Sequence, residues 1–172
     1  MVSELINYKK KISSPLGSLY LVANDQALIF LDTAPGDIFN ALPSANHKVL
    51  DLVHRQLDEY FNGKRLEFNL PLNPSGTPFQ QKAWNALTKI PYGKVWSYGQ
   101  QAKFLKSPLA CRAVGAANGK NPISIIIPCH RVVGSTGKLT GHSGGMKMKI
   151  DLLELEGHVI SGLQIMNYFL HK

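Results

Sequence analysis

The stretch Ser97–Gly119, SYGQQAKFLKSPLACRAVGAANG, decides how the second half of this chain folds. Ser97 is a favourable N-cap for a helix over YGQQAKFL, and Ser107 is placed to cap a second helix over PLACRAVGAANG. A short turn around KSP joins the two. Two short helices with a tight turn are typical of a helix-turn-helix, although many helical hairpins of this size bind nothing.

The charge around this stretch indicates a partner. The chain has 172 residues and a net charge of +8, which is unevenly divided. Residues 1–75 hold seven Lys/Arg against eight Asp/Glu, a net −1, whereas residues 76–172 hold twelve against three, a net +9. Between Phe79 and Ile150 there are eleven basic residues and no acidic one. Such a block predicts a nucleic acid partner, because phosphate contacts supply sequence-independent affinity. A basic surface that serves only solubility is the alternative, but it does not explain the loss of every carboxylate.

The first third of the chain has the pattern of a small antiparallel sheet followed by a helix. NYKKKIS, GSLYLVA and ALIFLD are β-rich runs, separated by the turn signals SPLG and NDQ. Apolar residues then recur at helical spacing from Asn46 to Phe61, and Gly63 ends the run. The segment LPLNPSGTP, with three prolines and a glycine, marks a domain boundary after Ser75.

A further helix is expected after this boundary. Thr77 can cap it with Pro78 at its first position, FQQKAWNALTKI continues it, and the turn PYGK ends it. We therefore expect an α+β protein of two domains. Residues 1–75 form a supporting antiparallel sheet with a helix, and residues 76–172 form a mostly helical, winged helix-turn-helix-like domain for DNA binding and catalysis.

Composition excludes several classes of protein. The chain is 44% hydrophobic, enough for a core, but no apolar run approaches the roughly 20 residues of a membrane helix. The start MVSELINYKKKISS lacks the apolar centre of a signal peptide, so we expect an intracellular protein that does not bind membranes. Its two cysteines, Cys111 and Cys129, are expected to be free thiols.

Cys129 lies in the stretch Ile125–Val133, IIIPCHRVV, where a buried-looking strand runs into a Cys-His pair. A thiol reacts as its thiolate, and the adjacent His130 could supply a base or a positive field. The alternative is a buried structural cysteine beside a surface histidine. Zinc is discounted, because the chain has no Cys-x-x-Cys or His-x-x-x-His spacing.

IPCHRVV, together with PYGKVWSYGQ, CRAVGAANGKNP and GHSGGMKMKIDLLELEG, resembles the O6-alkylguanine-DNA alkyltransferase family. The resemblance covers Phe79–Gly157, while the first 75 residues agree only in their coarse pattern. It implies a suicide repair protein, a methylated-DNA–[protein]-cysteine S-methyltransferase. Such a protein binds double-stranded DNA in the minor groove and flips out O6-alkylguanine, or O4-alkylthymine. The expected protein is a monomer without cofactor or metal, cytoplasmic or, in a eukaryote, nuclear.

The resemblance also assigns roles in the reaction. Cys129 matches the cysteine that accepts the alkyl group and is never regenerated. His130 matches the base that deprotonates it through a water, and Glu156 matches the carboxylate that orients the imidazole. Asn121 matches the hinge residue that braces the turn before the active site.

For DNA, Arg112 matches the arginine that fills the space of the extruded nucleotide, and Tyr98 matches the tyrosine that crowds the target phosphate and contacts the guanine. The small Ala113 and Gly115 would let the helix approach a narrow groove, although small residues also serve helix packing. The remaining expected DNA contacts are Ser97, Lys120 and Arg131.

In the base pocket, Val132 and Ser143 match positions that read guanine through backbone groups. His142 departs from the family pattern, which commonly has a tyrosine in a GYSGG-like loop. A neutral imidazole can still donate one hydrogen bond to the guanine O6, and below its ordinary pKa of about 6.5 it would become a charged donor. A second departure is MKMKIDLL, where family members often carry a tryptophan.

Two other classes of protein were weighed. An alkyltransferase-like protein binds lesions but lacks the acceptor cysteine, and Cys129 argues against it. A transcription factor would read bases in the major groove, but the alanine-rich second helix lacks Asn, Gln or Arg side chains spaced for that purpose.

Overall fold

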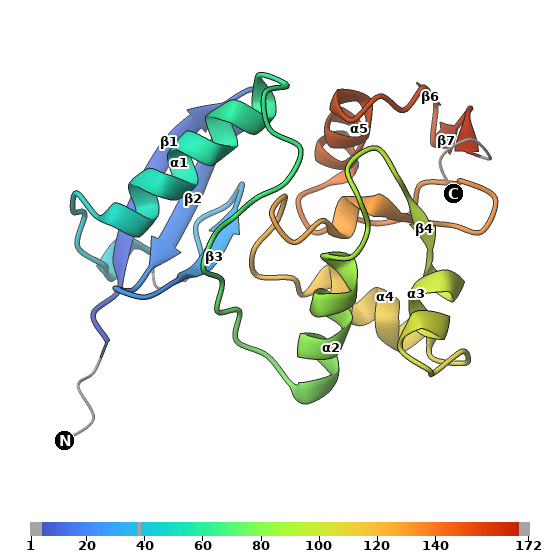
Figure 1. Cartoon of the computed structure of the whole chain (residues 1–172), viewed down its shortest axis with the longest axis horizontal. Coiled ribbons are helices and arrows are strands. Elements are labelled where there is room, and N and C mark those ends of the chain that lie inside the picture. The colour runs from blue at the N-terminus through green and yellow to red at the C-terminus, as the bar shows by residue number, and fades with distance from the viewer. Residues whose placement is uncertain (1–4, 38, 169–172) are drawn as a thin grey trace. The chain divides into compact units, whose positions relative to one another are not determined.

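The computed structural model describes residues 5–37 and 39–168, and the chain divides into two compact units, Met1–Ser75 and Gly76–Lys172 (Figure 1). Within the described residues, no helix is both long enough and apolar enough to span a membrane.

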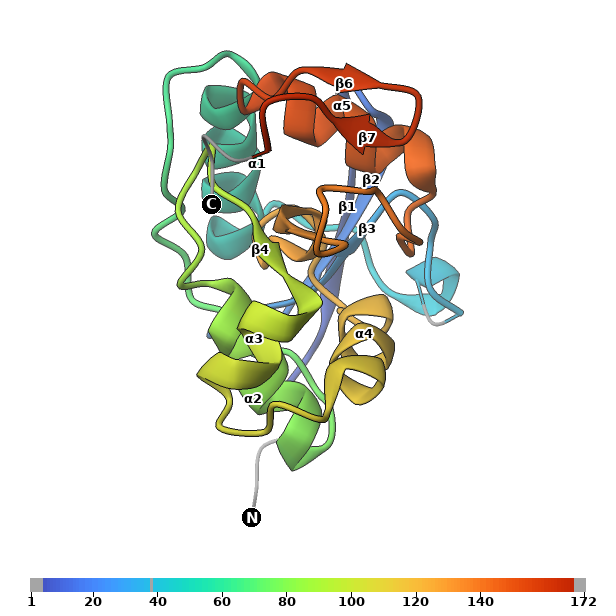
Figure 2. The ribbon, with the colours of Figure 1, turned by 90° about the vertical axis from the view of Figure 1, so that its right-hand side faces the viewer.

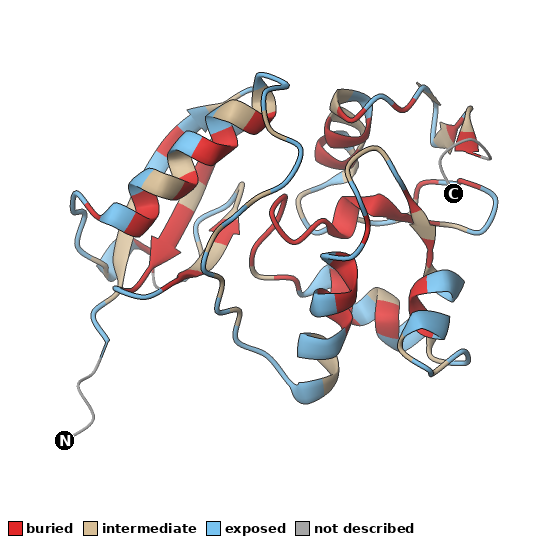
Figure 3. Ribbon diagram, viewed as in Figure 1, coloured by how far each residue is buried: buried red, intermediate tan, exposed pale blue. Residues whose placement is uncertain are grey.

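The N-terminal unit is a three-stranded antiparallel sheet with one long helix. Its strands are β1 (Tyr8–Ser14), β2 (Gly17–Ala23) and β3 (Leu28–Asp32), in the order β1-β2-β3. A short 3-10 helix, η1 (Phe39–Ala41), precedes α1 (Lys48–Phe61), and the buried face of α1 is turned toward the sheet (Figure 3). The predicted meander and helix are confirmed.

Local signals explain where these elements end. Gly17 has a φ of +96° in the tight turn between β1 and β2, a conformation that glycine adopts without strain. Gly63 has a φ of +69° just after α1, and the Lys64 N–H donates back to the carbonyl of Glu59 at 2.8 Å. This is the hydrogen-bond pattern of a glycine-terminated helix.

The C-terminal unit gathers three helices at one end: α2 (Pro78–Leu87), α3 (Tyr98–Phe104) and α4 (Cys111–Gly119) (Figure 2). The opposite end holds α5 (Met146–Leu155) and a hairpin of β6 (Ile160–Ser161) and β7 (Gln164–Ile165). Two short parallel strands, β4 (Trp96–Ser97) and β5 (Val132–Val133), and the 3-10 helix η2 (Cys129–Arg131) complete the unit.

Two of the three predicted caps in this unit are confirmed. Thr77 and Ser97 each form a full capping box, in which the cap hydroxyl accepts from the N–H three residues on and a glutamine side chain accepts from the cap N–H. The predicted cap Ser107 is wrong. Residues 108–110 form a turn closed by an Ala110 N–H to Ser107 carbonyl bond of 2.9 Å, so α4 begins only at Cys111.

Buried polar groups fix the packing of the helix-turn-helix. The amides of Gln101 on α3 and Asn118 on α4 pair reciprocally, at 3.0 and 2.7 Å. The indole N–H of Trp84 on α2 donates to the carbonyl of Ala117 at 2.8 Å. Because a buried polar group left unpaired costs free energy, these bonds favour one arrangement of the three helices.

The segment before η2 is a turn, and the strand predicted there is wrong. Ile125 has a φ of +72°, which is unusual for a β-branched residue, and it is buried. The Asn121 side chain holds this turn by donating to the carbonyl of Ile127 at 2.8 Å and accepting from the N–H of Ile123 at 3.0 Å. The predicted bracing by Asn121 therefore has a structural basis.

Candidate functional site

Cys129 is the first residue of η2 and is buried, with 5% of its surface exposed. The turn held by Asn121 ends directly before it, and the Cys129 N–H bonds to the carbonyl of Ile127 at 2.9 Å. The backbone around the thiol is therefore fixed by local hydrogen bonds.

His130 and Glu156 lie together, as the sequence predicted. The Nε2 of His130 is 2.9 Å from Oε1 of Glu156, and both side chains are fully buried. A carboxylate only accepts, so Nε2 carries the proton and Nδ1 of the neutral ring holds a lone pair. Among the described residues, that Nδ1 has no hydrogen-bond partner. Burial lowers the pKa of His130 despite the nearby carboxylate, so the ring is neutral and able to accept a proton.

Arg131 lies inside the protein, which corrects its prediction as a DNA contact. Its guanidinium donates to both carboxylate oxygens of Glu156, at 2.9 Å from Nε to Oε2 and 2.9 Å from Nη2 to Oε1. A further bond of 2.6 Å runs from Nη1 to the carbonyl of Ile90. Burial alone would raise the pKa of Glu156, but His130 and Arg131 outweigh it and hold that pKa below its ordinary value. Glu156 is therefore a carboxylate at neutral pH.

His142 reaches the thiol from the loop before α5. Its Nε2 lies 3.5 Å from Sγ of Cys129. Burial, together with the neighbouring His130 and the charge of Lys149, lowers the pKa of His142 to about 3. The charged donor expected below pH 6.5 is thus absent from the physiological range.

Lys149 on α5 is a site residue that the sequence interpretation missed. It is 1% exposed, and its ammonium donates to the carbonyls of Val132 at 2.6 Å and Thr140 at 3.2 Å. Burial lowers its pKa to about 8, and interaction with Cys129 opposes that shift. A signal was present: Lys149 shares the apolar stripe of α5 with Leu152 and Leu153, at helical spacing.

Two expected pocket positions differ in their surroundings. Val132 is fully buried on β5, and its carbonyl already accepts from Lys149, although an oxygen can accept twice. Ser143 is exposed in the loop beside His142.

Tyr98 begins α3 and joins this region to the helix-turn-helix. Its hydroxyl is 2.9 Å from that of Thr140, and its ring passes beside Gly115 of α4, where an added Cβ would lie 3.6 Å from Cε1. Gly115 therefore packs against an expected substrate contact.

The expected DNA contacts differ in exposure. Arg112, Ala113 and Lys120 are exposed on or just after α4. Ser97 is buried, and its hydroxyl accepts from the Gln100 N–H at 3.1 Å. The hydroxyl of Ser97 thus caps α3, and its expected contact with DNA stays a prediction.

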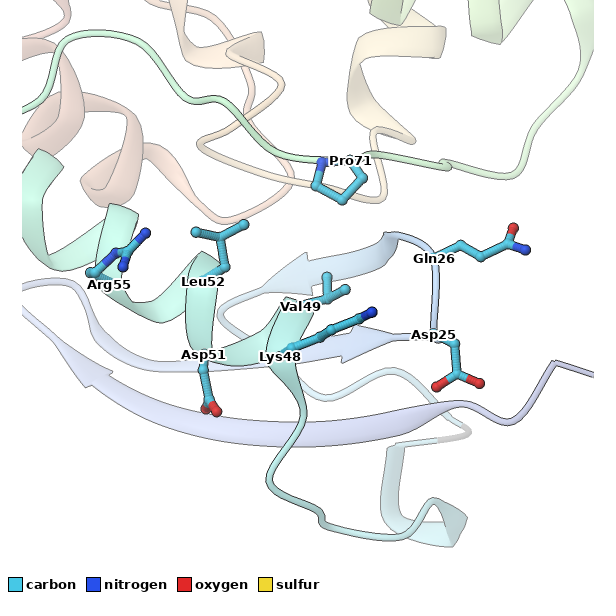
Figure 4. Close-up of a pocket in the computed structure, with 8 residues that line it drawn as sticks. All are labelled: Asp25, Gln26, Lys48, Val49, Asp51, Leu52, Arg55 and Pro71. Carbon is cyan, nitrogen blue, oxygen red and sulfur yellow. The ribbon is translucent and has the colours of Figure 1, made fainter.

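A separate hollow of about 660 Å³ lies in the N-terminal unit, between α1, the β2–β3 turn and Pro71 (Figure 4). None of the predicted site residues lines it.

Across the described ranges, no three His, Cys, Asp or Glu side chains are grouped as metal ligands would be.

Comparison with known proteins places both units in one family. Residues 78–158 match the family model described as 6-O-methylguanine DNA methyltransferase, DNA binding domain, and residues 7–74 match its ribonuclease-like domain. The methylated-DNA–protein-cysteine methyltransferase of Methanosarcina barkeri is 46% identical over 152 residues, covering 87% of this chain and 96% of the relative.

Solved structures agree with this match. The Mycobacterium tuberculosis O6-methylguanine methyltransferase superposes with a TM-score of 0.81 at 42% identity, covering 88% of this chain and 93% of its own. The Mycobacterium tuberculosis protein named OGT, in complex with DNA, gives a TM-score of 0.78 at 43% identity, covering 87% of this chain and 92% of its own.

Proposed function

This chain belongs to the 6-O-methylguanine DNA methyltransferase family, and on that premise we propose that Cys129 takes the alkyl group. The chain is a repair protein that transfers the alkyl group of O6-alkylguanine in DNA to a cysteine of its own and so restores the base. Because a thioether is not a leaving group for water, one molecule repairs one lesion. The presence of Cys129 distinguishes it from lesion-binding proteins that lack an acceptor.

The observation that carries the assignment to Cys129 is the chemistry of its neighbour. His130 is neutral, holds its proton on Nε2 against Glu156, and keeps the Nδ1 lone pair free of partners among the described residues. Arg131 keeps Glu156 ionised and aimed at His130. This is the nucleophile, base and orienter arrangement of activated nucleophiles. The other cysteine, Cys111, lies on α4 outside this cluster.

The proposed reaction has two proton movements and one bond exchange. Nδ1 of His130 takes the thiol proton, directly or through a water, and the resulting imidazolium is stabilised by Glu156. The thiolate of Cys129 attacks the alkyl carbon, so that an S–C bond forms while the C–O6 bond breaks. The electron pair passes to the guanine, which takes up a proton and leaves as the restored base.

For the DNA, we propose that α4 enters the minor groove and that Arg112 fills the space of the flipped nucleotide. Arg112 is exposed in the first turn of α4, and exposed Ala113 and half-buried Gly115 leave little bulk on the helix. An inserted planar cation offsets part of the few kcal/mol that unstacking a base costs. Tyr98 and Lys120 are the other residues that we propose to contact DNA. We also propose O4-alkylthymine as a second substrate.

The remaining proposals concern the whole chain. Residues 76–172 bind DNA and perform the transfer, and residues 1–75 support them. The protein acts as a monomer, since one cysteine meets one lesion. It works where the DNA lies, in the cytoplasm or, in a eukaryote, the nucleus.

The test is incubation with a duplex that carries one O6-methylguanine, followed by intact mass measurement and peptide mapping. We expect one added methyl on Cys129 in the wild type and in Cys111→Ser, and none in Cys129→Ser. The Cys129→Ser variant should still bind the duplex, because phosphate contacts supply the affinity. A methyl on Cys111, or retained transfer to Cys129→Ser, contradicts the assignment.

A further inference from the structure

Both neutral imidazoles of the site, His130 and His142, carry their proton on Nε2, but the two protons face different partners. The Nε2–H of His130 donates to the carboxylate of Glu156. His142 comes from a different segment, with Nε2 at 3.5 Å from Sγ of Cys129. That separation suits an N–H donor to sulfur, whose large radius makes such bonds longer than those to oxygen.

The tautomer of His142 follows from its second nitrogen. The backbone N–H of Gly144 lies 3.2 Å from Nδ1 of His142, and a backbone N–H can only donate. Nδ1 therefore holds the lone pair, and the proton of the neutral ring is on Nε2, facing the sulfur. With a pKa lowered to about 3 by burial and by the neighbouring His130 and Lys149, the ring keeps this one form at physiological pH.

The loop holds the ring in place. The Gly145 N–H donates to the carbonyl of His142 at 3.0 Å, and Gly145 has a φ of +89° that favours glycine. At Gly144, an added Cβ would overlap Sδ near the end of the flexible Met148 side chain and would be in van der Waals contact with the His142 ring. The positive φ of Gly145 and the limited space beside Gly144 thus favour glycine in the loop that carries His142.

We propose that His142 is a catalytic residue that donates its Nε2 proton in a hydrogen bond to the Cys129 thiolate. The proposal rests on Cys129 being the alkyl acceptor. It separates two tasks between two histidines: His130 accepts the thiol proton, and His142 stabilises the sulfur anion that remains. A hydrogen bond to the charged form lowers the pKa of a thiol and also lowers the intrinsic nucleophilicity of its thiolate.

Other charged groups act on the same sulfur and must stay constant in a test. The ammonium of Lys149 on α5 interacts electrostatically with Cys129. Glu156 and Arg131 act through His130. Replacing His142 alone leaves all four of these groups in the chain.

The experiment measures the rate of Cys129 alkylation by iodoacetamide from pH 5 to pH 10 without DNA, with peptide mass spectrometry to separate Cys129 from Cys111. His142→Phe removes the donor, whereas His142→Gln keeps an N–H donor. For a thiol pKa raised by about one unit, the thiolate fraction at pH 7 falls about tenfold and its intrinsic reactivity rises about threefold. We therefore expect His142→Phe to be about threefold slower than wild type at pH 7 and about threefold faster on the alkaline plateau.

This crossing of the two profiles is the supporting result, with His142→Gln lying closer to wild type. A superimposed profile, or a uniform fall at every pH, overturns the proposal, because a purely structural role would change access and not the pKa. His54→Phe, a substitution on α1 in the N-terminal unit, is the matched control and should leave the profile unchanged.

If His142→Phe does not fold, the wild type still decides the matter. A ¹⁵N spectrum of the histidine rings should show His142 protonated on Nε2 alone at pH 7, and a proton on Nδ1 overturns the proposal. Neither measurement uses a lesion. A wild type that takes no methyl from DNA would therefore refute the proposed function while leaving the thiol profile to be judged separately.

Discussion

Replacement of Lys149 by methionine tests the buried charge beside the thiol. The pKa of Lys149 is about 8 in the folded protein, against an ordinary value of 10.5 that applies to the unfolded chain. Between these values the unfolded chain binds a proton that the folded protein does not. The free energy of unfolding of the wild type must therefore rise with pH across this window.

The size of the effect follows from the two pKa values. Below pH 8 the full penalty of holding a buried ammonium is present, about 3 kcal/mol at 1.36 kcal/mol per pKa unit, and above pH 10.5 it is gone. Integrated from pH 7 to pH 10, the wild type should gain about 2.5 kcal/mol relative to Lys149→Met. The bonds lost to the carbonyls of Val132 and Thr140 add an offset that does not depend on pH.

The assay is urea unfolding followed by tryptophan fluorescence at pH 7, 8, 9 and 10. Both tryptophans of the chain, Trp84 and Trp96, lie in residues 76–172, so the signal reports the unit that contains Lys149. Lys147→Met is the control, because that side chain is 87% exposed and pairs with Asp151 on the surface. A difference between wild type and Lys149→Met that stays constant from pH 7 to pH 10 would refute the reasoning.

Three further predictions concern the reaction and its loop. Arg131→Lys loses the two-point contact with Glu156, so the pKa of Glu156 should rise. On acidification, the rate of transfer from free O6-benzylguanine should then start to fall at a higher pH than in the wild type. A pH–rate profile identical to wild type contradicts this. Arg112→Ala should slow methyl transfer from duplex DNA by roughly tenfold or more but leave the free base rate unchanged, and equal losses would make Arg112 structural. Gly144→Ala should destabilise the protein by about 1–3 kcal/mol in urea unfolding, because its Cβ meets Met148, and an unchanged midpoint would show that the loop yields freely.

Local sequence signals predicted the helices that begin with a side-chain cap. Thr77 and Ser97 were identified because a capping box needs only residues within one turn. The prediction that Ser107 caps a helix was wrong. The carbonyl of Ser107 accepts from the Ala110 N–H and closes a turn, so Ala110 is the N-cap of α4. The strand predicted around Ile125 was wrong for another reason. Isoleucines favour strands, but the turn that Asn121 holds by its hydrogen bonds overrides that preference.

The candidate site was predicted in part. Cys129, His130 and Glu156 were assigned through resemblance, and the geometry brings the last two within 2.9 Å. The pKa of His142 could not be read from sequence, because it depends on burial and on charges from other segments. The sequence interpretation made no assignment for Lys149, because its burial depends on how α5 packs.

The burial of Arg131 and Lys149 has one physical origin. A buried carboxylate and a buried thiolate are stable only with positive charge or hydrogen-bond donors beside them. Two of the eleven basic residues in the carboxylate-free block are buried: Arg131 donates to Glu156, and Lys149 donates to the carbonyls of Val132 and Thr140. The charge offered to phosphates is therefore smaller than the sequence total, and one of the buried cations, Arg131, keeps Glu156 ionised inside the protein.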